Sequence, residues 1–275
     1  MTTIFQTKSH LSHWIFPAFA VLFLGFIGTI AYSTHHPLAD WNNYRAAVFA
    51  LLRLEHNPPG LYNPPWIYVP LIPLALLPPA VGSAFIAVLC YLVYWIVIRR
   101  LGADNLTAIA FLSMPQIFFL SRNGSIDWLI PLGFILPPWL GLFVVLGKPQ
   151  IGIGIALYWG VSLLRERGVW YTVKTFAPVT IAYAWFVFIY QPGWGNVVEW
   201  NASYWPYGIP LGLALIVFAL RHQESNLAIL AGPFLAPYLG YYSWPAAMMG
   251  LARHKWEMIA AVAGMWIVAL LMHHF

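Results

Sequence analysis

The chain has 275 residues, of which 61% are hydrophobic and 8% charged, and its formal net charge is +5. Soluble domains typically carry about 25% charged residues, so this composition excludes a soluble globule and makes lipid the solvent of the fold. The apolar runs are continuous rather than alternating, which excludes a membrane β-barrel. They predict an all-α, polytopic transmembrane helical bundle. The excess of Lys and Arg is then explained by cytoplasmic loops, and we expect no nucleic-acid partner.

Apolar runs follow one another along the whole chain, and prolines interrupt many of them. They cover residues 14–32, 66–79, 84–98, 106–120, 126–137, 139–146, 151–164, 176–190, 209–220, 227–242, 244–251 and 258–272. Several are shorter than the roughly 20 residues of a straight span, so we expect about 10–11 membrane segments, several of them short or broken. Because composition does not shift along the chain, we predict a single transmembrane domain over 1–275. It has a first span at 14–32, an outer loop at 33–82 and the remaining spans at 83–275.

The first apolar run follows Lys8 and has no evident small-residue cleavage site, so we interpret it as a retained span rather than a signal peptide. The N-terminus is then cytoplasmic, in a multi-pass protein of the plasma membrane. The single Cys90 excludes an internal disulfide, and no Cys/His spacing suggests a metal site.

Residues 126–146 decide the topology of the second half. If they form a short hairpin broken at Pro137-Pro138, Lys148 lies outside and Arg165 and Arg167 lie inside. If they form one full span, the sides of these residues are exchanged, which the positive-inside bias disfavours. We favour the hairpin. The basic residues expected inside are then Lys8, Arg99, Arg100, Arg165, Arg167, Lys174, Arg221, Arg253 and Lys255, and those expected outside are Arg45, Arg53, Arg122 and Lys148.

The outer loop begins with His35-His36 and the polar run from Asp40 to Arg45. From residue 40 to 56, apolar and aromatic positions recur at the spacing of one helix face, including Trp41, Tyr44 and Val48. We therefore predict an amphipathic helix on the outer surface. Asp40 stands at its start, where it is either a helix N-cap or a functional group.

The order of these motifs resembles the GT-C superfamily of membrane glycosyltransferases, and most closely the bacterial polyprenol-phosphate-mannose-dependent mannosyltransferases. The resemblance is carried by residues 39–46 (Ala-Asp-Trp-Asn-Asn-Tyr-Arg-Ala), by 62–65 (Tyr-Asn-Pro-Pro), by 121–127 (Ser-Arg-Asn-Gly-Ser-Ile-Asp), by 147–150 (Gly-Lys-Pro-Gln) and by 242–245 (Tyr-Ser-Trp-Pro). It covers most of the chain in patches, although the chain is shorter than is usual for the family.

The resemblance implies an inverting transfer of a mannose-like hexose from a polyprenyl-phosphate donor to an acceptor on the extracytoplasmic face. Asp40 would be the general base, and basic side chains would hold the phosphate. Arg122 and Lys148 are the first candidates for this clamp and Arg45 the third. Tyr44, His36, Asp127 and Gln150 are further candidates for substrate contacts. Apart from the lipid-phosphate sugar as co-substrate and membrane lipid, the resemblance implies no cofactor and no metal.

Each of these residues also has a structural interpretation. Arg122 could anchor the chain to headgroups, Lys148 could be a cytoplasmic flank in the rival topology, and His36 could be an interfacial spacer. At the level of function, the alternative is a non-catalytic membrane subunit derived from a GT-C protein, with protein partners in a larger complex. A transporter is disfavoured because the charges lie at the ends of spans rather than within them.

Overall fold

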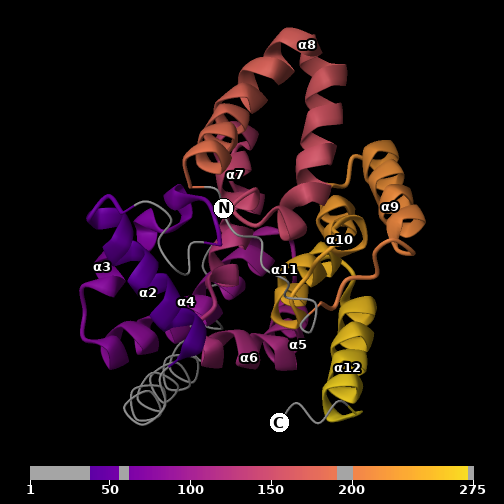
Figure 1. Cartoon of the computed structure of the whole chain (residues 1–275). Helices are drawn as coiled ribbons and strands as arrows, with labels where there is room; N and C mark the ends of the chain where they lie inside the picture. The colour runs from indigo at the N-terminus through magenta and orange to yellow at the C-terminus, as the bar shows by residue number, and fades with distance from the viewer. Residues whose placement is uncertain (1–37, 56–61, 191–200, 272–275) are drawn as a thin grey trace, which may run out of the picture.

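A computed structural model describes residues 38–55, 62–190 and 201–271, which are helical with irregular connections and a single isolated β-bridge between Asn201 and Gly240 (Figure 1). The predicted first span at 14–32, with His35 and His36, lies outside the described residues. The all-α prediction is confirmed within the described part. The elements, including the 3-10 helices η, are α2 (Ala39–Leu52), η1 (Pro65–Ile67), η2 (Val69–Leu71), α3 (Ile72–Ala75), α4 (Pro79–Arg100), α5 (Asn105–Leu112), α6 (Pro115–Asn123), η3 (Ile126–Ile135), α7 (Pro138–Val145), α8 (Pro149–Tyr190), α9 (Ile209–His222), α10 (Ser225–Leu235), η5 (Tyr241–Ser243), α11 (Trp244–Met248), η6 (Met249–Leu251) and α12 (Lys255–Leu271).

Helix α2 confirms the helix predicted after residue 40. The first part of its predicted apolar face is buried, since Trp41, Tyr44 and Val48 are each at most 6% exposed, whereas Leu52 at its end is 51% exposed. Trp41 packs on Gly82 near the start of α4, so this face contacts the protein itself. Leu38 is the N-cap residue and no side chain caps the helix. The N-cap interpretation of Asp40 is therefore wrong: Asp40 is the second residue of the helix.

The proline-rich run after α2 is divided into η1, η2 and α3, none longer than four residues. Pro64, Pro70 and Pro73 explain the division, because proline lacks a backbone donor and disfavours helical conformation in the residue before it. This agrees with the placement of residues 66–79 in the predicted outer loop rather than in a span.

Residues 126–148 form the predicted hairpin. Leu136 and Pro137 are extended between η3 and α7, and Gly133 of η3 lies against Gly141 and Val145 of α7. The ion pair between Lys148 and Asp127 brings the end of the segment back to its start. The interpretation of 126–146 as one continuous span is therefore wrong; the side on which the hairpin lies stays a prediction.

Two described helices are long and apolar enough to cross a membrane, α4 and α8. Helix α8 is bent back on itself at Gly168, where φ is +80°, and Figure 1 shows its two halves as a hairpin that projects from the body. The halves, 149–167 and 169–190, are each roughly 30 Å long at 1.5 Å per residue. Large apolar side chains such as Leu157, Ile181 and Phe188 are exposed along them, as expected for a surface that faces lipid or a partner.

The two ends of α4 have different surroundings. Helices α2 and α3 pack near its start. At its end, after Arg99 and Arg100, the carbonyl oxygen of Leu101 accepts hydrogen bonds from Asn226 and Arg253 (3.1 and 3.2 Å). Nearby, His254 lies 3.4 Å from Glu224. Four residues expected inside, Arg99, Arg100, Arg253 and Lys255, thus belong to this end or adjoin it in sequence.

Candidate functional site

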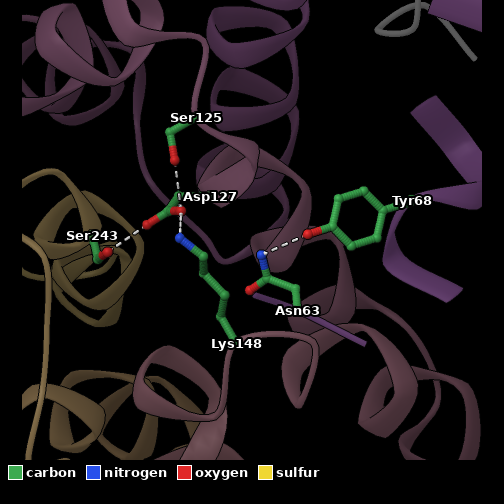
Figure 2. Close-up of polar contacts among 6 residues, drawn as sticks. All are labelled: Asn63, Tyr68, Ser125, Asp127, Lys148 and Ser243. Atoms are coloured by element: carbon green, nitrogen blue, oxygen red, sulfur yellow. Dashed lines mark hydrogen bonds and ion pairs between the residues drawn. The ribbon is translucent and has the colours of Figure 1, made fainter. Parts of the chain in front are cut away.

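Segments that are far apart in the sequence meet around the carboxylate of Asp127 (Figure 2). Lys148 pairs with its Oδ1 atom, and the hydroxyl of Ser125 donates to the same oxygen at 2.9 Å. The hydroxyl of Ser243 donates to Oδ2. The motifs at 121–127, 147–150 and 242–245 (Tyr-Ser-Trp-Pro) are therefore brought together at one buried point.

Local backbone features explain how Asp127 reaches this position. Gly124 ends α6 with φ at +69°, a conformation that residues with a Cβ rarely adopt. A Cβ at Gly124 would lie 2.7 Å from Cβ of Trp41, so the turn fits closely against α2. Asp127 follows in the first turn of η3 and is fully buried. Asp127 thus follows closely, in sequence, a turn that packs against Leu38 and Trp41 at the start of α2.

Lys148 lies in the turn between α7 and α8 and is 7% exposed. Its Nζ atom lies 5.7 Å from the ring centroid of Tyr242, in addition to its pairing with Asp127. Burial is the largest single influence on the pKa of Lys148 and lowers it. The charge and hydrogen bond of Asp127, together with Tyr242 and Asp40, raise the pKa by more in total, so the net pKa is raised. Lys148 is therefore a buried cation, held in place by a buried anion.

Asp40 differs from Asp127 because one of its oxygens is unpaired within the described part of the chain. Its Oδ2 atom is buried and has no hydrogen-bond partner among the described residues. Burial raises the pKa of Asp40; Lys148 opposes this rise, Asp127 adds to it, and the hydroxyls of Tyr242 and Ser125 oppose it. Asp40 therefore has an unpaired oxygen and a raised affinity for a proton, the properties of a side chain that can accept one from a substrate.

Tyrosines line the neighbourhood of the two carboxylates. Tyr44 lies one turn after Asp40 on α2, and burial followed by the charge of Asp40 raises the pKa of its hydroxyl well above the usual value. Its ring centroid is 6.0 Å from that of Tyr68, whose hydroxyl accepts a hydrogen bond from Asn63 at 3.4 Å (Figure 2). The Tyr-Asn-Pro-Pro element is thereby connected to the same region.

The other predicted site residues are Arg45, Arg122 and Gln150, which are described below, and His36, which lies outside the described part. The guanidinium of Arg45 donates to the carbonyl of Ala75 at 2.9 Å and lies 4.9 Å from the ring centroid of Phe49, so it fastens α2 to α3. Arg122 is exposed in the last turn of α6. Gln150 is half-buried in the first turn of α8.

Three residues of this cluster were not predicted as site residues, namely Ser125, Tyr242 and Ser243. All three belong to motifs quoted above, and a hydroxyl within each motif was the available signal. No group of three or more potential metal ligands occurs in the described residues, so the arrangement is one of acids, a lysine and hydroxyls.

Comparison of the chain with family models, curated proteins and solved structures finds no match.

Proposed function

We propose that the protein is an integral-membrane glycosyltransferase that uses a polyprenyl-phosphate hexose as donor. Asp40 would accept the proton of an acceptor hydroxyl. As it loses this proton, the acceptor oxygen would attack the anomeric carbon of the donor sugar. The bond from that carbon to the phosphate oxygen would break, the polyprenyl phosphate would leave, and the configuration of the anomeric carbon would be inverted. Arg122, at the exposed end of α6, is the candidate contact for the departing phosphate, because a guanidinium can bind phosphate through two hydrogen bonds.

The observation that supports this proposal most directly is the difference between the two carboxylates. Both oxygens of Asp127 are paired, whereas Oδ2 of Asp40 is buried and has no partner among the residues that the structure describes. Where a carboxylate acts in general acid–base catalysis, its pKa is often raised by burial, and the pKa of Asp40 is raised mainly by burial. Its position near the start of α4, away from the end that carries Arg99 and Arg100, agrees with chemistry on the extracytoplasmic side.

The decisive experiment compares the purified wild-type protein with the Asp40→Asn variant, using polyprenyl-phosphate hexoses and candidate acceptors. Loss of a positioned general base typically lowers the rate by about 10²–10⁴, and we expect a loss in this range. Asp104→Asn is the matched control, because Asp104 caps α5 by accepting from the Thr107 amide at 2.7 Å and Asn caps helices equally well. Absence of transfer and of donor hydrolysis by wild type, with stable copurification of a larger complex, would instead support a non-catalytic subunit.

A further inference from the structure

The ammonium group of Lys148 is already committed to protein partners. Its Nζ atom pairs with Asp127, a fully buried residue whose two oxygens also bind Ser125 and Ser243. Lys148 is 7% exposed, so a donor phosphate would have to enter a buried site and share the ammonium group with Asp127, and weakening a buried ion pair is unfavourable. This arrangement argues against Lys148 as the phosphate clamp suggested by the resemblance.

Asp40 is the neighbouring carboxylate, and residues 38–55, 62–190 and 201–271 offer no hydrogen-bond partner to its Oδ2 atom. The described titratable groups that act on it are Lys148 from the α7–α8 turn, Asp127 from η3 and Tyr242 from η5, with Tyr44 beside it on α2. Tyr238, in the segment before η5, is also affected by Asp40. Lys148 is the one cation in this set, so it faces two carboxylates while its hydrogen bond goes to one of them.

We propose that Lys148 is a positioning residue whose positive charge is shared by two carboxylates, Asp127 and Asp40. Asp127, which is itself fixed by Ser125 and Ser243, holds Lys148 in the position where its charge acts on both. This proposal rests on the proposed function, in which Asp40 must be ionised to accept a proton. It replaces a direct phosphate contact by an electrostatic effect on the base, and it gives the Tyr-Ser-Trp-Pro element a role in the same site.

Two substitutions should act on Asp40 in opposite directions. In Lys148→Met the cation that favours ionised Asp40 is lost, so the pKa of Asp40 should rise. The acid limb of the pH–activity profile should then move to higher pH. In Asp127→Asn a repelling anion is lost and Lys148 is released toward Asp40, so Asp40 ionises at lower pH. A carboxylate beside a cation typically has its pKa lowered by about 1–3 units, and we expect shifts of roughly this size. A phosphate clamp predicts instead a raised donor KM in Lys148→Met without movement of the acid limb.

The test is a titration of Asp40 by 13C NMR in detergent, with the signal assigned by Asp40→Asn, in wild type, Lys148→Met, Asp127→Asn and the double variant Asp127→Asn/Lys148→Met. The double variant removes both charges and retains a neutral site if either single variant fails to fold. Arg53→Met is the control. Arg53 is an exposed cation in the same predicted outer loop as Asp40, and its guanidinium lies 3.6 Å from the carboxylate of Glu55. This variant should leave the titration of Asp40 unchanged.

Shifts of the Asp40 pKa in opposite directions in the two single variants support the shared counter-ion. If one single variant fails to fold, the double variant is compared with the other one, and its shift from that variant should be opposite to the shift of that variant from wild type. Shifts in the same direction, or none, overturn it. The titration needs no turnover, so a wild-type protein without transferase activity would refute the proposed function and leave this result to be judged separately.

Discussion

Helices α8 and α10 are in backbone contact at Gly154, which makes this residue a sensitive test of the packing that supports the site. A Cβ built at Gly154 lies 2.1 Å from the carbonyl oxygen of Ala228 and 2.9 Å from the amide nitrogen of Gly232, whereas ordinary contact begins at 3.4 Å. The atoms in contact belong to the backbone, so no side-chain rotation can relieve the overlap. In Gly154→Ala the two helices would have to separate by about 1.3 Å, and overpacking of this kind typically costs about 1–3 kcal/mol.

The matched control is Gly264→Ala in α12, another helical glycine, where a Cβ would have nothing within 4 Å. There the substitution should raise the free energy of unfolding by up to about 1 kcal/mol, because alanine has a higher helix propensity than glycine. Intrinsic fluorescence of the 15 tryptophans gives the unfolding midpoint in detergent, and 1 kcal/mol corresponds to roughly 2–4 °C for a chain of this size. We expect Gly154→Ala to unfold below wild type and Gly264→Ala at or above it. If Gly154→Ala were as stable as Gly264→Ala, the close approach of α8 and α10 would be refuted.

Two further predictions concern the attachment of α2 and the topology. Replacing Arg45 by Met removes the hydrogen bond to Ala75 and should lower the free energy of unfolding, measured by denaturant titration, by about 1.5–3 kcal/mol. Arg53→Met, which breaks an exposed ion pair, should cost less than about 1 kcal/mol. Equal losses in the two variants would contradict the structural role of Arg45. A membrane-impermeant maleimide should label a Glu166→Cys variant from the cytoplasmic side and a Tyr62→Cys variant from the outer side, both positions being exposed and the native Cys90 buried; labelling of both from one side would reject the predicted topology.

Several features of the fold follow from short-range patterns in the sequence. The recurrence of Trp41, Tyr44 and Val48 predicted that α2 is helical and that these side chains share a face, although not that the face is buried against the protein. Pro137-Pro138 predicted the break between η3 and α7. These features depend on backbone sterics and on burial within a few helical turns, so local sequence contains the information. The bend within α8 was anticipated only as a gap between the apolar runs 151–164 and 176–190, and the structure places it at Gly168.

The candidate site was predicted in part, because its motifs were recognised but their partners were not. Asp40, Tyr44, Asp127 and Lys148 were proposed from motif order, and the structure brings them into one region. Arg45 was proposed on the same grounds, yet it binds the backbone of α3. A motif identifies the type of side chain available, whereas the direction in which that side chain points depends on the helix it packs against.

The sequence by itself determined an apolar, helical chain with its polar groups concentrated at the ends of apolar runs, because composition and periodicity fix what each segment can bury. Only the tertiary structure decided which polar groups meet. Asp127 pairs with Lys148, 21 residues away, and with Ser243, 116 residues away, whereas one oxygen of Asp40 has no partner in the described part of the fold. The partner of a buried charge depends on how distant helices pack, because in a medium of low dielectric each charge must be satisfied by whichever groups the fold brings within reach.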